Sequence, residues 1–120
     1  MEHAIKPEQH GALGQPMADA VQTCVHCGFC LAACPTYQEF GQEMDSPRGR
    51  IHALKAIEAG ELALDATVAS HFDSCLGCLA CVSACPSGVR YDQLLEATRP
   101  QLNAPGLRSP GQNALRRALF

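Results

Sequence analysis

The sequence predicts an all-α fold, because helix signals recur along the chain and strand signals do not. Ser46 followed by Pro47 is a typical helix start, in which serine caps the first turn and proline takes its first position. Gly60 is a typical helix end. The 40 residues from 35 to 74 show no alternation of apolar and polar side chains, which a half-buried strand would require.

Helical character continues on both sides of this segment. Leu64, Val68 and Phe72 recur at intervals of four residues and would form one apolar stripe on a helix. A later segment, from Tyr91 to Thr98, places two leucines on one face and ends before Pro100. We expect helices over residues 17–22, from 47 to the stop at Gly60, over 65–74, over 91–98 and from Asn113 to the end.

The chain divides by composition into four segments. Residues 1–16 are polar and aperiodic, and we expect a flexible N-terminal arm. Residues 17–99 hold all the cysteines and form a single small domain. Residues 100–113 contain three prolines and two glycines, as a linker does. Residues 114–120 begin an amphipathic helix that docks on a partner or starts a following domain, because so short a helix is unstable alone.

All eight cysteines lie in two copies of the motif C-x2-C-x2-C-x3-C-P, CVHCGFCLAACP and CLGCLACVSACP. This spacing is the bacterial pattern for cubane iron–sulfur clusters. Three evenly spaced cysteines let a short loop wrap one cluster, and in two-cluster proteins the fourth cysteine ligates the other cluster. We therefore expect one [4Fe–4S] cluster on Cys24, Cys27, Cys30 and Cys85, and a second on Cys75, Cys78, Cys81 and Cys34.

Disulfides and zinc are the alternatives for so many cysteines. Disulfides belong to oxidising compartments, and the N-terminus shows no secretory signal. Zinc accepts paired C-x2-C units, but it gives no reason for a third evenly spaced cysteine or for the proline. His26 could also ligate iron, yet eight cysteines already supply every iron of two clusters. We expect His26 outside the ligand set.

Charge and hydropathy exclude several functions. Nine basic and twelve acidic side chains give a formal net charge of −3, which argues against nucleic acid as a partner. No stretch approaches the roughly 18 apolar residues of a transmembrane segment, so we expect a cytoplasmic protein. The sequence shows no nucleophile–base pair, phosphate loop or open metal site. We expect no substrate catalysis from this chain alone.

Apolar residues fill the spacers between the cysteines. We expect them to form a dry sheath that excludes water from the clusters. Three of them are also candidates to line the surface through which an electron enters, namely Phe29, Leu76 and Leu79. The sheath as a whole would comprise Phe29, Leu31, Leu76, Leu79 and Val82.

The turn after Ser46-Pro47 departs from local rules. Arg48 and Arg50 place cations in a first helical turn, where each opposes the macrodipole by ~0.3–1 kcal/mol. Gly49 inside a helix costs about another 1 kcal/mol. A solvated turn is the simplest interpretation. Because such departures concentrate at functional sites, we expect the arginines to face an anionic cluster, a carboxylate or a partner, while the glycine permits close packing. Glu43 and Asp45 are the candidate carboxylates.

Together these stretches resemble a known family. Residues 24–51, CVHCGFCLAACPTYQEFGQEMDSPRGRI, and residues 75–99, CLGCLACVSACPSGVRYDQLLEATR, resemble the N-terminal ferredoxin domain of the iron–sulfur subunit of bacterial glycolate oxidase (glycolate dehydrogenase). The resemblance implies an α-helical ferredoxin fold with two [4Fe–4S] clusters. It also implies a partner subunit with FAD that oxidises a 2-hydroxy acid, and a further acceptor such as quinone.

Other functions remain open beside this one. Related subunits occur in D-lactate dehydrogenases, in anaerobic glycerol-3-phosphate dehydrogenase and in heterodisulfide reductase. A cluster-based redox regulator is an alternative of a different class, although a sensor needs only one cluster. A free ferredoxin is disfavoured by the linker and the apolar tail. Through its complex the chain could lie peripherally at the inner face of a membrane.

Overall fold

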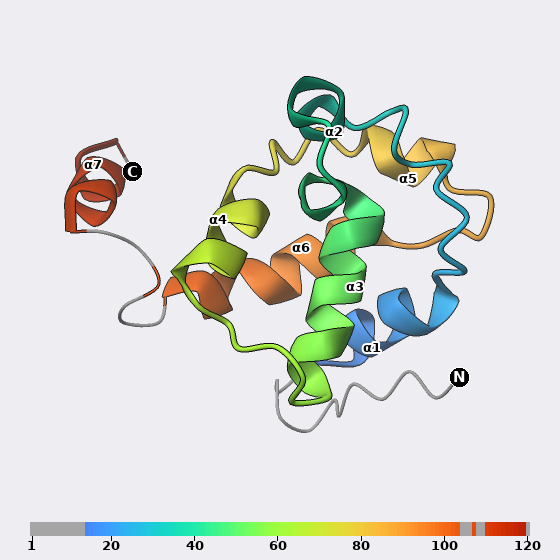
Figure 1. Ribbon diagram of the computed structural model, residues 1–120, viewed down its shortest axis with the longest axis horizontal. Coiled ribbons are helices and arrows are strands. Elements are labelled where there is room, and N and C mark those ends of the chain that lie inside the picture. The colour runs from blue at the N-terminus through green and yellow to red at the C-terminus, as the bar shows by residue number, and fades with distance from the viewer. Residues whose placement is uncertain (1–13, 104–106, 108–109, 120) are drawn as a thin grey trace.

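The computed structural model describes residues 14–103, 107 and 110–119, and every regular element within those ranges is a helix (Figure 1). The all-α prediction is confirmed. In this part of the chain no helix is both long and apolar enough to cross a membrane.

The core forms where α1 (Gly14–Thr23) packs against α6 (Tyr91–Thr98) and α3 (Pro47–Glu58). Helix α1 presents one apolar face, on which Met17 and Val21 are almost completely buried. Helix α6 buries Leu94 and Leu95 against it. The cysteine loops lie at the edge of this core. Cys81 joins it fully, and Cys24, Cys30, Cys75 and Cys85 pack partly against it.

Helix α3 begins as predicted. The Ser46 hydroxyl accepts a hydrogen bond from the Gly49 N–H at 3.0 Å, and Pro47 occupies the first turn. The helix ends before Gly60, which has a φ of 76°. Along it Ile51 and Leu54 are buried and face the core.

Helix α4 (Ala66–Asp73) also follows the predicted pattern. The Asp65 carboxylate caps it by accepting a hydrogen bond from the Val68 N–H at 2.9 Å. Val68 and Phe72 are buried in the core, as the four-residue spacing requires.

Four short helices were not predicted. They are too short for an apolar period to appear in sequence. Helix α2 starts directly after Cys34, with Pro35 in its first turn, and α5 lies within the second cysteine motif. The bounds are α2 (Pro35–Phe40), η3 (Glu43–Asp45), α5 (Ala80–Ala84) and η4 (Arg99–Asn103).

Both ends of the predicted domain need correction. Residues 14–16, assigned to the arm, belong to α1, and residues 1–13 lie outside the described residues. Pro100 ends the α-helix but not the packing, because Leu102 and Leu107 of the predicted linker are buried in the core. Helix α7 (Pro110–Leu119) begins three residues before Asn113, and all of it is exposed. In Figure 1 it lies apart from the other helices, and its role as a docking helix stays a prediction.

Gly49 should be irreplaceable for steric reasons. A Cβ there would lie 1.9 Å from the Glu43 carbonyl oxygen, so Gly49→Ala must displace backbone. We expect a loss of about 2–3 kcal/mol in the free energy of unfolding, despite the better helix propensity of alanine. Anaerobic denaturant titration of the cluster-loaded chain measures it. Gly111→Ala is the matched control, because that helical glycine has open space around it and should leave core stability unchanged. Equal stability of both variants would contradict the packing argument.

Candidate metal centre

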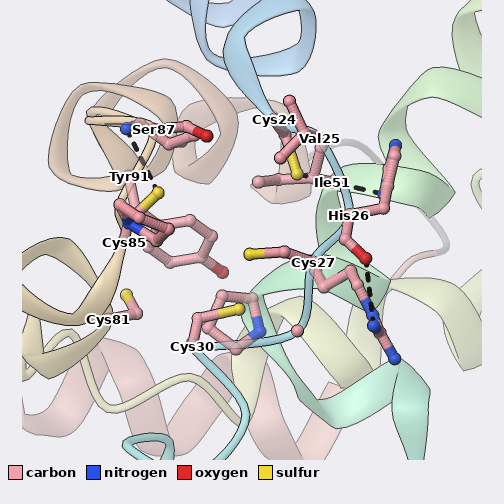
Figure 2. Close-up of a pocket in the computed structure, with 15 residues that line it drawn as sticks. Cys24, Val25, His26, Cys27, Cys30, Ile51, Cys81, Cys85, Ser87 and Tyr91 are labelled. Atoms are coloured by element: carbon pink, nitrogen blue, oxygen red, sulfur yellow. Dashed lines mark hydrogen bonds between the residues drawn. The ribbon is translucent and has the colours of Figure 1, made fainter.

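The structure arranges the eight cysteines around two cavities. None of the eight forms a disulfide, and all lie in the described part of the chain. Figure 2 shows the sulfurs around the first cavity turned toward one common space. The first cavity is lined by Cys24, Cys27, Cys30 and Cys85, and the second by Cys34, Cys75, Cys78 and Cys81; Cys81 also reaches the first.

The grouping crosses the two motifs. Cys85 of the second motif lies with the cysteines of the first, and Cys34 lies with those of the second. The thiols surround cavities and do not converge on a point. In the described ranges no three His, Cys, Asp or Glu side chains form a site for a single ion. This arrangement fits a polynuclear cluster that fills each cavity and meets thiolates at its corners.

The two cysteine loops share one feature of their backbone. Positive φ angles occur at the third and fifth positions of each motif: 58° at His26 and 84° at Gly28, then 69° at Gly77 and 62° at Leu79. Left-handed residues of this kind turn backbone N–H groups toward one side, where they form a concave site for an anion. A side chain in this region costs about 1 kcal/mol. Each loop therefore has one glycine and one strained residue. In the first loop the strained residue is third and the glycine fifth, and in the second loop this order is reversed.

An arginine covers the glycine of each loop. A Cβ on Gly28 would lie 2.6 Å from Arg48 Nη1, and a Cβ on Gly77 would lie 3.1 Å from Arg99 Nη2. Arg48 Nη1 also donates to the His26 carbonyl at 3.1 Å, and Arg99 Nη2 approaches the Cys75 carbonyl at 3.4 Å. Each loop is thus held from outside by a cation from a distant helix.

Arg48 has the carboxylate partner that was expected. Its Nε and Nη2 donate to the two carboxylate oxygens of Glu43, at 2.6 and 2.9 Å. This pairing lowers the pKa of Glu43 and raises the pKa of Arg48. The bidentate contact explains why a cation is tolerated in the first turn of α3.

Arg50 is buried, with 1% of its surface exposed. Its Nε donates to the His71 carbonyl at 2.7 Å, and Nη2 donates to the hydroxyls of Ser74 and Thr36 at 2.9 and 3.1 Å. Nη1 has no hydrogen-bond partner among the described residues. The side chain lines the second cavity, so an acceptor there would complete its hydrogen bonds.

Asp45, the second candidate carboxylate, contacts neither arginine through its side chain, and that expectation was wrong. Its Oδ1 lies 2.8 Å from His71 Nδ1 and accepts a hydrogen bond from the Ser74 hydroxyl at 3.3 Å. The pairing brings α4 against the turn before α3. Nothing in the spacing of the sequence indicates it, because Asp45 and His71 belong to different elements.

Cys34 is prepared for a thiolate by the start of α2. Burial raises the pKa of its thiol, but hydrogen bonds from the Thr36 side chain and from the backbone of Tyr37 and Thr36 outweigh it and lower the pKa. The Thr36 oxygen lies 3.2 Å from the sulfur. Deeper in the core, burial and the neighbouring Cys75 raise the pKa of Cys81 to about 12. A bound metal deprotonates such thiols and releases protons.

The prediction that apolar spacer residues shield the cavities from water holds for only some of them. Phe29 and Leu76 are 64% and 70% exposed, and Leu79 is 39% exposed, so these side chains face solvent beside the cavities. Leu31 and Val82 are half-buried, as a sheath requires. His26 lines the first cavity with its Nδ1 3.9 Å from the Cys24 sulfur.

Sequence reasoning missed two residues of the site, Arg99 and Tyr91. Tyr91 lines both cavities and its hydroxyl has no hydrogen-bond partner in the described part of the chain. Burial raises the pKa of its phenol, so the proton stays on the oxygen. An unpaired buried hydroxyl costs about 1–3 kcal/mol. The only sign of this role in the sequence is a tyrosine five residues after the last motif proline. Its position in the lining of both cavities follows only from the tertiary structure.

The sequence pattern of the 4Fe-4S dicluster domain matches residues 20–89, which include both cysteine motifs. The chain belongs to this family. The match agrees with the presence of two cysteine cavities in a helical fold. The dicluster domain has no significant match among solved structures.

Two relatives point to a particular subunit within this family. The chain is 47% identical over 98 residues to the probable glycolate oxidase iron-sulfur subunit of Bacillus subtilis (strain 168), a match that covers 81% of this chain and 22% of that protein. The chain is 51% identical over 84 residues to the glycolate oxidase iron-sulfur subunit of Escherichia coli (strain K12). This match covers 68% of this chain and 20% of that protein. The chain thus spans about a fifth of the length of these curated relatives. The resemblance to this subunit family is confirmed.

A more distant match concerns a different complex. The chain is 28% identical over 102 residues to one subunit of the dihydromethanophenazine:CoB–CoM heterodisulfide reductase of Methanosarcina mazei, covering 72% of this chain and 25% of that protein. The cysteine motifs alone therefore do not separate the two kinds of complex.

Gly28→Ala should disturb the first loop and leave the fold intact. Gly28 needs its φ of 84°, and an added Cβ would displace the Arg48 guanidinium. We expect a loss of one cluster, measured as a fall of about half in iron and acid-labile sulfide. Gly41→Ala is the control, since Gly41 also has a positive φ, of 67°, but open space around it. It should cost about 1 kcal/mol of stability and no iron. Full iron content in Gly28→Ala would show that the arginine contact is dispensable.

Proposed function

We propose that the dicluster domain relays electrons for a flavin-dependent 2-hydroxy-acid dehydrogenase, with glycolate as the substrate. The observation that carries the proposal is the pair of adjacent cysteine cavities, whose linings share Pro47, Cys81 and Tyr91. When bound there, each [4Fe–4S] cluster takes up and releases one electron at a time. The names of the Bacillus and Escherichia relatives support the choice of substrate.

The proposed ligands are the crossed sets. Cys24, Cys27, Cys30 and Cys85 hold one cluster, and Cys75, Cys78, Cys81 and Cys34 hold the other. Backbone N–H groups of the left-handed loops lie ready to donate to cluster sulfur. Arg48 and Arg50 serve as charged neighbours of the first and second cavity, respectively.

The partner we propose is a subunit that contains FAD. A flavin accepts two electrons from the hydroxy acid, and one-electron carriers must remove them. Exposed apolar side chains beside the cavities favour electron entry there, in particular Phe29, Leu76 and Leu79. A quinone is the proposed acceptor. The complex would be cytoplasmic, or peripheral at the inner face of the membrane.

A heterodisulfide-reductase-like role is the second candidate, and the Methanosarcina match favours it. Equivalent subunits of D-lactate or glycerol-3-phosphate dehydrogenase would use the same cavities with another partner. A redox regulator is disfavoured, because two adjacent cavities serve transfer between clusters and a sensor needs one.

Crossed ligation is tested by comparing two cysteines of one motif. The loaded chain should contain about eight irons and eight sulfides, from two cubanes of four each. Cys34→Ser and Cys78→Ser should alter the same cluster signal in electron paramagnetic resonance, while Cys30→Ser alters the other. If Cys34→Ser and Cys30→Ser alter the same signal, the ligands do not cross. Zinc without sulfide would contradict the cluster itself.

The relay is tested by reconstitution with the flavoprotein subunit. Reduction of flavin by glycolate should survive omission of this chain, whereas glycolate-dependent reduction of a quinone analogue should collapse. Leu76→Ser should slow quinone reduction without loss of iron, because Leu76 is exposed beside the second cavity. Phe40→Ser is the matched control, because Phe40 is 57% exposed and lines neither cavity. Quinone reduction that needs no clusters would refute the relay.

A further inference from the structure

The wall between the two cavities contains one side-chain hydroxyl. The residues that line both cavities are Pro47, Cys81 and Tyr91. Proline has no side-chain donor, and Cys81 belongs to the second cysteine set. Among the described residues the wall therefore offers the Tyr91 hydroxyl as its hydrogen-bond donor outside the cysteines.

This hydroxyl is buried and unpaired. Tyr91 is 3% exposed, and its oxygen has no hydrogen-bond partner in the ranges that the structure describes. Figure 2 shows the ring reaching from the start of α6 with its hydroxyl directed into the space among the sulfurs of the first cavity. A phenylalanine would fill the same volume without an unpaired polar group. The Arg50 guanidinium lies near enough to act on this phenol, but a guanidinium can only donate, so the hydroxyl proton still points to an acceptor that the protein itself does not provide.

We propose that the Tyr91 hydroxyl donates a hydrogen bond to the cluster of the first cavity and raises its reduction potential. Cluster sulfides and cysteine thiolates are the acceptors available in such a cavity. Reduction adds one electron and makes these sulfurs more negative. A donor to sulfur therefore stabilises the reduced cluster more than the oxidised one. The proposal rests on the presence of the clusters and is independent of the substrate and partner of the relay.

The second cavity has a different donor. Arg50 lines this cavity and not the first, and its Nη1 is a buried nitrogen without a hydrogen-bond partner among the described residues. The loops themselves are alike in conformation, so Tyr91 and Arg50 make the two sites unequal. The first cavity also has a cation in its lining, but Arg48 is paired with the Glu43 carboxylate, whereas Arg50 donates only to neutral groups among the described residues.

Tyr91→Phe tests the proposal in the cluster-loaded chain. It removes the hydroxyl and keeps the ring, so iron and sulfide content should stay unchanged. Redox titration followed by electron paramagnetic resonance should show the ratio of reduced to oxidised first cluster falling about tenfold at a fixed ambient potential, about 59 mV for one electron. The signal altered by Cys34→Ser identifies the second cluster. An unmoved first-cluster potential, or movement of the second cluster alone, would overturn the assignment.

The chain provides a matched control and a second measurement. It has two tyrosines, and Tyr37 lines neither cavity, so Tyr37→Phe should leave both potentials unchanged. In the Tyr37→Phe background, 3-fluorotyrosine replaces Tyr91 alone and makes its phenol a stronger donor. The first-cluster potential should then move upward. If Tyr91→Phe fails to load clusters, this second measurement decides, and an unmoved potential overturns the proposal.

Discussion

A buried guanidinium beside a cavity of cysteines is the constraint on which the rest of the dicluster domain depends. Arg50 donates only to neutral groups among the described residues, a carbonyl of α4 and two hydroxyls. A buried cation costs several kcal/mol unless negative charge lies near it. Four thiolates around a [4Fe–4S] core supply a net charge of about −2. Burial of Arg50 and loading of the second cavity should therefore be coupled, as folding and metal binding are in small metal domains.

The repeat in the sequence becomes a repeat in backbone, not in side chains. Both loops adopt left-handed angles at the same two positions, although His26 and Gly28 in one loop correspond to Gly77 and Leu79 in the other. Strain that persists at a histidine in one copy and a leucine in the other is imposed by the site, since local preference would differ between them. What the two loops share is an anion to surround. The arginines that cover the two loops come from different elements, Arg48 from α3 and Arg99 from η4. The contact is therefore the same in both loops, although the sequence repeat does not include the arginines.

Local signals were sufficient for most of the helices. The start of α3 at Ser46-Pro47 depends on one cap and one proline, which neighbouring residues decide. The packing of Leu107 and the pairing of Asp45 with His71 could not be predicted from the sequence. Both contacts join segments that come together only in the tertiary structure. Tyr91 was missed for a related reason. Its hydroxyl is unusual only because it is buried and unpaired, which no spacing in a sequence can express.

The shared lining of the two cavities and the exposed apolar side chains beside them have one physical cause. Each motif sends its last cysteine to the other cavity, so the two cavities must lie within the reach of a short loop. The two cavities share Pro47, Cys81 and Tyr91 in their linings, and cavities this close favour electron transfer between groups bound in them. Apolar side chains that a larger protein would bury, such as Phe29 and Leu76, then remain at the surface beside the cavities. The crossed arrangement of the cysteines thus accounts both for the closeness of the cavities and for the exposed apolar side chains beside them.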